Sequence, residues 1–341
     1  MTSHRSEVSR MMMIKHLVNH KQWLGQPEDY STCMLVTSLS HAYAHMFIFA
    51  TLMLGGTSVI ARHSDKLLEM INEHKVTLAV LYPYHLKMMI NSVASHDNKP
   101  TSLKAVTTAA APLAASVAEA FRQKMDVSVY NMWGMTEVTS ISTMCLVTSD
   151  YKQCCIGKIL PFFELKVEDV KTKHMLPPGQ SGEFRIRSPM TLLGYVDNPA
   201  ATAEIKDDDG WIHTGDYGHY DNQGFIYLTD RIKDLIKGLR NTKVLPSELE
   251  NLLLQHPHVA EAVVVGVYGD DLEELPRAFV VLKPDTPMEP CVLLKFVNDR
   301  VPDYKQLSGG VWIVKDIPKN SSSKPLRGLL RDGNITPLKK C

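Results

Sequence analysis

Hydrophobic and polar residues follow two different periods along the first part of the chain. Between Leu35 and Val129, short apolar runs such as "TSVIA" and "VTLAVLYP" have the composition of strands, and stretches such as "KLLEMINEH" have the spacing of a helix. Strands that alternate with helices predict a parallel sheet that is covered by helices. The apolar run from Met46 to Gly56 is too short to cross a bilayer, and we predict a buried helix there.

The pattern changes near Gly157. Between Gly157 and Tyr227, short β-type runs such as "FELKVEDV", "GEFRIRS" and "GFIYLT" are separated by Gly, Pro and Asp turns, which predicts a more antiparallel, barrel-like region. After "LTDRIKD", a helix with Pro246 at its start, two strands and a second helix predict a compact α+β unit. We therefore expect an α/β fold with a large domain over residues 1–230 and a small α+β domain over residues 231–341.

The composition is that of an ordinary globular protein. Its 37 basic and 37 acidic side chains give zero formal net charge, and the absence of a basic stripe argues against nucleic-acid binding. The six cysteines are scattered without a C-x-x-C pair, and we interpret them as reduced thiols in a cytosolic-type compartment. We expect no secretory signal, no membrane span and no peroxisomal or prenylation signal.

Three short segments contain more polar chemistry than a core needs. In "YNMWGMTEVTS", Thr136 and Glu137 follow Gly134 closely. A glycine lets the backbone approach a ligand, while a hydroxyl and a carboxylate can bind a phosphate and a hard cation. The simpler interpretation is a turn after the preceding strand.

The second segment is "GWIHTGDYGHYDNQGFIYLTDRIKD", which contains Asp216 and Arg231. A carboxylate can accept both hydroxyls of a ribose, and a guanidinium can bridge ribose and phosphate oxygens; the alternative is a surface ion pair on a hairpin. The third segment is "IPKNSSSKPLRG", in which Lys324 is either a catalytic cation or a solvated charge on a linker.

The order and spacing of these segments resemble the adenylate-forming acyl-CoA synthetases, nearest the branch of 4-coumarate–CoA ligases and beetle luciferases. The similar runs, which cover nearly the whole chain, are "SHAYAH", "TAAAPL", "YNMWGMTE", "GYVDNPAATAE", "GWIHTGDYGHYDNQGFIYLTDRIKDLIK", "LPSELE", "HPHVAEAVVVGV" and "IPKNSSSKPLRGLLR". The resemblance implies a large domain of parallel sheets with a barrel and a small mobile C-terminal domain. It also implies ATP, Mg²⁺ and coenzyme A as cofactors and a small-molecule carboxylic acid as substrate.

The resemblance implies a role for each polar residue named above. Glu137 resembles a Mg²⁺-binding carboxylate, Thr136 a phosphate-contacting hydroxyl, Asp216 a ribose anchor and Arg231 its partner. The nucleotide-binding set implied in this way is Ala109, Ala110, Ala111, Asn131, Trp133, Gly134, Thr136, Asp216, Arg231 and Lys237. Attack of a carboxylate on a triphosphate brings two anions together, so these cations and ligands would have to offset charge and hold the atoms in line.

Two lysines and the acyl pocket complete the implied site. Lys233 occupies a hinge position, and Lys324 resembles the lysine that reaches from the small domain to the adenylate. His41 and Tyr43 match acyl-pocket positions. His41 and His45 also have a spacing that suits a metal on a helix, but no further ligand follows, and we favour a pocket or packed histidine.

The sequence departs from the family pattern in several places. A Gly-rich phosphate loop is expected immediately before "SHRS", so we expect an N-terminally truncated large domain with an uncovered sheet at Cys33. The turn "GLRNTK" replaces a Lys-Gly pair, although Asn241 tolerates a left-handed conformation, and Ser323 stands where a glycine is usual.

Three hypotheses follow. The first is an ATP-dependent carboxylic acid–CoA ligase that forms an acyl-adenylate and then a thioester. The second is an inactive truncated relic or isoform that acts as a binding protein, and the third is a luciferase-like monooxygenase acting on an adenylate. The methionine-rich pocket segment suits an aromatic or a medium-chain acid, and the expected location is cytoplasmic, or peroxisomal by family analogy.

Overall fold

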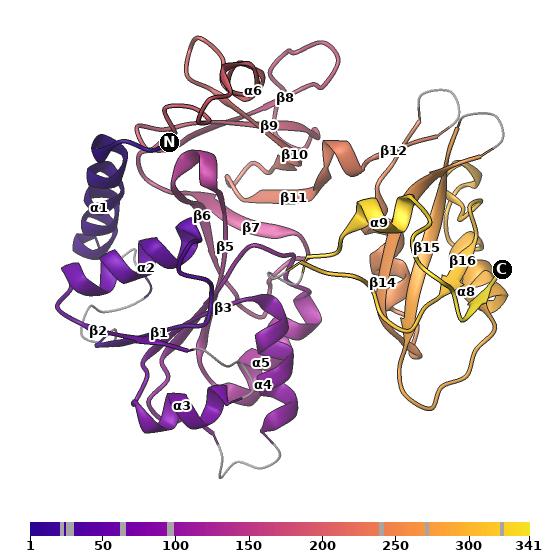
Figure 1. The fold of residues 1–341 in the computed structure, drawn as a ribbon, viewed down its shortest axis with the longest axis horizontal. Coiled ribbons are helices and arrows are strands. Elements are labelled where there is room, and N and C mark those ends of the chain that lie inside the picture. Colours follow the sequence, from indigo (N-terminus) through magenta and orange to yellow (C-terminus); the bar gives the residue numbers. More distant parts are fainter. Residues whose placement is uncertain are drawn as a thin grey trace. The chain divides into compact units, whose positions relative to one another are not determined.

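The computed structural model forms two compact units. The first contains Met1–Thr214 and Gly218–Leu228, and the second contains Gly215–Tyr217 and Thr229–Cys341. The structure describes residues 1–20, 24, 31–61, 66–93, 99–238, 242–269, 273–320 and 324–341 (Figure 1).

Five neighbouring strands form the parallel part of the first unit. They are β2 (Thr57–Ile60), β1 (Thr32–Leu35), β3 (Leu78–Leu81), β4 (Ala105–Thr108) and β5 (Ser128–Met135), in that spatial order. Both β3 and β4 are buried along their whole length, as expected for strands covered on two faces. The predicted parallel sheet is confirmed.

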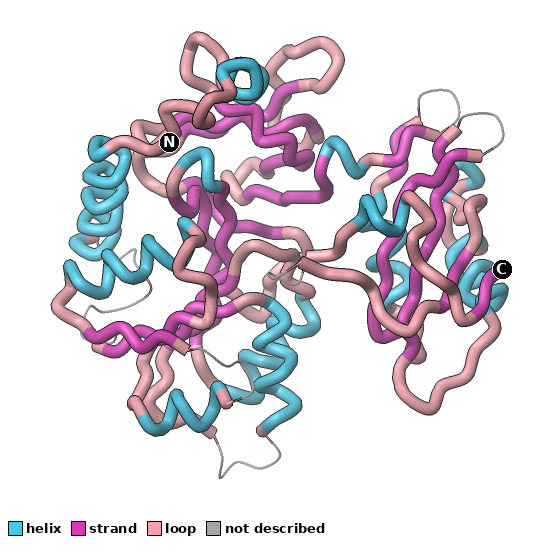
Figure 2. The backbone as a smooth tube through the Cα atoms, in the orientation of Figure 1, coloured by secondary structure: helices cyan, strands magenta, loops and turns pink. Residues whose placement is uncertain are grey.

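Further strands continue the sheet beyond β5, where the pairing changes to antiparallel. Figure 2 draws the strands in magenta. In spatial order these further strands are β6 (Ser140–Leu146), β7 (Cys155–Ile159), β11 (Ile226–Arg231), β10 (Ile212–Tyr220), β9 (Gly182–Arg187) and β8 (Glu164–Glu168). The change to antiparallel pairing therefore begins at β6, earlier than the change in texture at Gly157.

Helices cover the two faces of this sheet, each over its own hydrophobic cluster. One face carries α1 (His4–Asn19) and α2 (Ala42–Met53), and the other carries α3 (Leu67–Glu73), α4 (Pro83–Ser92) and α5 (Ala115–Met125) (Figure 1). A short helix, α6 (Pro199–Ile205), and a 3-10 turn, η3 (Thr136–Val138), complete the described part of the unit.

The second unit is a small α+β fold. Its sheet has the order β14 (Val259–Tyr268), β15 (Glu274–Leu282), β16 (Val311–Ile313) and β17 (Lys339–Lys340). Its other elements are β12 (Ile236–Lys237), β13 (Lys243–Val244), α7 (Pro246–Leu254), α8 (Pro290–Asn298), α9 (Arg327–Arg331) and the 3-10 turns η4 (Ile232–Asp234) and η6 (Asp303–Lys305). One cluster packs α7 and α8 against the sheet, and another contains Leu330 of α9. The mixed α/β fold with a small C-terminal domain is confirmed.

The prediction of a fully buried helix at Met46–Gly56 was wrong in part. A helix is present, but Phe49, Leu52 and Met53 are 46%, 62% and 40% exposed. Apolar residues surround α2 on all sides, whereas the described part of the chain covers only one face of it. At the sheet edge, Ile60 of β2 is also half exposed.

Helix α1 was not predicted. Ser3 caps it by accepting a hydrogen bond from the backbone N–H of Ser6, and Met13, Ile14 and Leu17 form its buried stripe. The i, i+1, i+4 spacing of that stripe was a usable signal that the polar flanks obscured.

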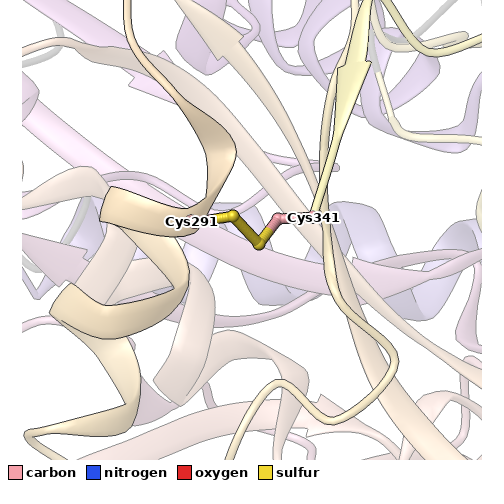
Figure 3. The surroundings of a disulfide bond; sticks show 2 residues. All are labelled: Cys291 and Cys341. Atoms are coloured by element: carbon pink, nitrogen blue, oxygen red, sulfur yellow. A yellow bond between two sulfur atoms is a disulfide. The ribbon is translucent and has the colours of Figure 1, made fainter.

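The prediction that all six cysteines are reduced thiols was wrong. Cys291, in the first turn of α8, is bonded to Cys341, which directly follows β17, with the Cα atoms 5.3 Å apart (Figure 3). The two residues are 50 positions apart, and only the pairing of β17 with β16 beside α8 brings them together. The other four cysteines are not disulfide-bonded.

Candidate functional site

The carboxyl ends of the parallel strands in the first unit carry most of the predicted binding residues. His41 is the N-cap of α2 and Tyr82 is the N-cap of α4, so both lie where a strand has ended and a helix begins. Their rings meet edge to face with centroids 6.4 Å apart. In open α/β sheets this edge is where ligands bind.

Tyr43 lies beneath this edge. It is buried, and its hydroxyl donates to Thr107 Oγ1 of β4 at 2.7 Å, while burial raises its pKa. The side chain therefore links α2 to the sheet as a neutral phenol. His45 is exposed, and within the described residues no cluster of three metal-binding side chains occurs, so the structure offers no ligand set for a metal at His41.

The predicted adenylate loop begins directly after β4. Ala109 is buried and Ala110 is exposed in a left-handed conformation with φ of +70°. Immediately before it, the hydroxyl of Thr108 is buried and has no hydrogen-bond partner among the described residues. A buried orphan hydroxyl beside a strained loop is the kind of group that a bound ligand satisfies.

Asn131 and Trp133 support the site from within β5. Asn131 Nδ2 lies 2.9 Å from both Tyr151 Oη and the carbonyl oxygen of Cys155, and Trp133 packs edge to face on Phe184. Both side chains are at most 8% exposed. In this structure they hold β5 in place, and their predicted contact with a nucleotide stays a prediction.

Glu137 is oriented by a residue that the sequence reasoning missed. Tyr195 donates its hydroxyl to Glu137 Oε1 at 2.7 Å, and the N–H of Leu192 donates to the backbone carbonyl of Glu137 at 2.7 Å. Burial raises the pKa of Tyr195 to about 12, with Glu137 as a further cause. Gly134 and Thr136 beside it are exposed. Tyr195 lies in the run "GYVDNPAATAE", so its place in a family-like run was the available signal.

The second unit brings the predicted ribose anchor and its partner together. Asp216 is 2% exposed, and its Oδ1 lies 2.6 Å from Nε of Arg231. Lys324 is half-buried, and its pKa is lowered by burial first and then by Arg231, while Asp216 and Asp234 oppose the shift. The lysine therefore lies in the electrostatic field of this pair, in the same unit.

The other two predicted lysines are exposed. Lys233 lies in η4, and the backbone N–H of Lys237 donates to Glu274 Oε2 at 2.8 Å. Asn241 and Ser323, at which the sequence departs from the family pattern, lie outside the described residues.

A buried charge network holds the segment after Lys324. Arg327 Nη1 donates to Glu250 Oε1 at 2.7 Å and to the carbonyl of Val264 at 2.6 Å. Nearby, Asp230 Oδ2 accepts the hydroxyl of Ser247 at 2.7 Å, and burial raises the pKa of Asp230 to about 7. Sequence reasoning missed this network, although Asp230 and Arg327 lie within the segments it selected.

The carboxylate of Glu137 offers oxygen atoms of the kind that a hard cation binds. One carboxylate oxygen accepts the phenol of Tyr195, and oxygen ligands are what Mg²⁺ prefers. The buried Asp216, the guanidinium of Arg231 and the nearby lysine suit ribose hydroxyls and an anionic phosphate. Within the described residues, no helix is both long and apolar enough to span a bilayer.

Comparison with known proteins identifies the family. The AMP-binding enzyme model matches residues 1–196, and the model of the AMP-binding enzyme C-terminal domain matches residues 248–324. A 4-coumarate–CoA ligase-like protein of Arabidopsis thaliana is 32% identical over 96% of this chain and 60% of its own length. Luciferin 4-monooxygenase of Photinus pyralis is 36% identical over 75% of this chain and 46% of its own length. The chain thus spans about half to 60% of these curated relatives.

Solved structures give the same result. The o-succinylbenzoate–CoA synthetase of Bacillus subtilis in complex with ATP and magnesium ion is 26% identical, with a TM-score of 0.82 over 97% of this chain and 66% of that one. The amide bond synthetase of Marinactinospora thermotolerans is 28% identical, with a TM-score of 0.84 over 95% of this chain and 65% of that one. Because the first family model covers more than half of its residues, the chain belongs to the AMP-binding enzymes, the adenylate-forming family of the 4-coumarate–CoA ligases and luciferases that it resembles.

Proposed function

We propose that this chain contains the adenylate-handling part of an ATP-dependent carboxylic acid–CoA ligase. The observation that carries the proposal is the ion pair of buried Asp216 with half-buried Arg231, whose charges act on Lys324. Three charged groups that are partly withdrawn from water have a large electrostatic influence on a bound anion. A structural surface pair would leave both side chains exposed, whereas Asp216 is almost completely buried.

Each charged residue then has a task in the first half-reaction. Asp216 accepts the ribose hydroxyls, and Arg231 fixes that carboxylate while it bridges to the phosphate. Lys324 places positive charge where negative charge develops as the carboxylate attacks the α-phosphorus. Lys237 contacts the adenylate, and Lys233 is the hinge.

Residues of the first unit have predicted tasks of their own. Glu137, held by Tyr195, provides an oxygen ligand for Mg²⁺, which when bound offsets the charge of the phosphates. Thr136 and the loop of Ala109 to Ala111 contact the nucleotide, and His41 and Tyr43 line the acyl pocket. Residues 1–230 are the adenylation domain, and residues 231–341 are the C-terminal domain. Coenzyme A as the acceptor, and a cytoplasmic or peroxisomal location, stay predictions.

The experiment is pyrophosphate exchange with a panel of aromatic and medium-chain carboxylic acids. We expect acid-dependent exchange that Lys324→Ala slows severely, while thioester formation from a supplied acyl-adenylate falls much less. Lys315→Ala is the matched control, because it removes the same charge from an exposed position of the same unit. Equal loss in both half-reactions would show that Lys324 supports the fold, and an absence of exchange with a folded preparation would reject the ligase assignment for this chain.

A further inference from the structure

Two thiols of the first unit lie in contact close to Asn131, one of the predicted nucleotide-binding residues. Cys145 in β6 and Cys155 in β7 have their sulfur atoms 3.8 Å apart, and both residues are buried. They are the same kind of group on adjacent strands, and neither is part of the disulfide. The roles assigned above use neither thiol.

The backbone explains why the sulfurs meet. Strands β6 and β7 pair antiparallel, with Met144 opposite Lys158. Gly157, with φ of +89°, lies so close to β6 that a Cβ atom there would be 2.0 Å from the carbonyl oxygen of Met144. Only glycine permits this approach, and the approach brings Cys145 and Cys155 to within reach of a short movement.

The surroundings make the two sulfurs chemically different. The contact with Cys145 lowers the pKa of Cys155 to about 7, with the N–H of Gly157 and the charge of Lys152 as further causes, while burial and Asp221 oppose the shift. Cys145 Sγ also donates to the carbonyl oxygen of Leu146 at 3.6 Å. The pKa of Cys145 is raised by the same contact and by burial. Because the N–H of Gly157 and the charge of Lys152 act on Cys155, we assign Cys155 as the nucleophilic member and Cys145, whose sulfur is 3.8 Å away, as the thiol that resolves its oxidised form.

A backbone contact links this pair to the predicted nucleotide site. The carbonyl oxygen of Cys155 accepts from Nδ2 of Asn131 at 2.9 Å and from the hydroxyl of Tyr151 at 3.0 Å. Asn131 belongs to β5, the strand that leads directly to Thr136 and Glu137. A shift of the Cys155 backbone toward Cys145 would therefore change a hydrogen bond that supports β5.

We propose that Cys145 and Cys155 form an oxidant-sensitive thiol pair whose closure to a disulfide weakens nucleotide binding at the adjacent strand. The oxidant is a hydroperoxide. The thiolate of Cys155 attacks the peroxide, giving a sulfenic acid and hydroxide; the thiol of Cys145 then attacks that sulfur, and water leaves as the S–S bond forms. The peroxide gains the two electrons that the two thiols lose. The effect on binding rests on the proposed function, whereas bond formation does not.

The first test maps the bond. The intact chain is treated with hydrogen peroxide, the remaining thiols are alkylated, and the digest is searched for a peptide joining Cys145 to Cys155 that is lighter by two hydrogen atoms. Cys154→Ser is the matched control, because Cys154 adjoins the pair and is more exposed, and it should leave the bond unchanged. A bond from Cys154 to either partner, or oxidation of Cys155 to sulfinic acid without a bond, overturns the proposal.

The second test measures binding of ATP by calorimetry before and after oxidation. We expect the affinity to fall about two- to tenfold, the range of one lost hydrogen bond. Cys145→Ala, treated identically, should keep its affinity, which separates the pair from damage elsewhere. A mapped bond with unchanged affinity refutes the coupling. If the reduced chain binds no ATP, the proposed function fails, and bond mapping still decides whether the pair forms.

Discussion

Asp230 gives the sharpest test of the energetics of the second unit. Its carboxyl accepts from Ser247, while Glu250 and Asp234 share the single guanidinium of Arg327 with it. Burial raises the pKa of Asp230 from 3.8 to about 7, with Glu250 as a further cause. The folded state thus holds a proton on Asp230 more tightly than the unfolded state does.

The sign of the pH dependence follows from this difference. Because the folded state binds more protons between these pH values, stability falls as pH rises from about 4 to about 7, and the contribution of Asp230 then levels off. Each tenfold difference in proton affinity corresponds to about 1.4 kcal/mol, so the full loss is about 4 kcal/mol. Asp230→Asn, which keeps an oxygen for Ser247, should remove this loss.

The assay is urea unfolding of the chain and of Asp230→Asn between pH 5 and pH 8, followed by circular dichroism. We expect the variant to gain about 3 kcal/mol of stability relative to the natural chain between pH 5 and pH 8, because the part of the loss below pH 5 lies outside this range. Asp332→Asn removes the same charge from an exposed position and should leave the difference flat. A variant that is less stable at pH 8 would refute the reasoning, because it would mean that Arg327 stabilises the ionised Asp230 by more than burial destabilises it.

Three further predictions concern the first unit. Tyr195→Phe should weaken Mg²⁺-dependent ATP binding by about tenfold in calorimetry with little change in melting, and unchanged affinity would show that the phenol does not orient Glu137. His85 accepts a hydrogen bond from the N–H of Tyr82, and burial lowers the pKa of His85 to about 4. Because the folded state then binds fewer protons than the unfolded state, stability should fall by about 3 kcal/mol as pH drops from about 6.5 to about 4. His85→Gln should flatten this loss in urea unfolding. Gly157→Ala should destabilise the chain by more than about 2 kcal/mol in urea unfolding, and a milder effect would mean that β6 and β7 separate easily.

The elements of the fold were predictable where one short segment determines its own environment. The run "VTLAVLYP" became β3, whose residues Leu78–Leu81 are all buried, because an apolar strand of this length has no polar face to expose. The run at Met46–Gly56 had the same apolar character, and the outcome differed because exposure depends on what covers the helix. The sequence of α2 contains no information about its neighbours.

The contacts of the candidate site were likewise predictable only where they join segments that are close in the sequence. Asp216 and Arg231 were predicted as partners, and Asp216 Oδ1 lies 2.6 Å from Arg231 Nε. They lie on β10 and β11, which are neighbours in the sheet and are joined by the turn that the run "DNQG" predicts. The contact of Glu137 with Tyr195 spans 58 residues, and the disulfide spans 50. In both cases the two residues belong to segments that are far apart in the sequence. They become partners only because the fold brings these segments together. Pairs within a hairpin can therefore be inferred from turn chemistry and spacing, whereas pairs between distant segments can be identified only once the fold is known. The contact of Tyr195 with Glu137 and the disulfide between Cys291 and Cys341 are of this second kind.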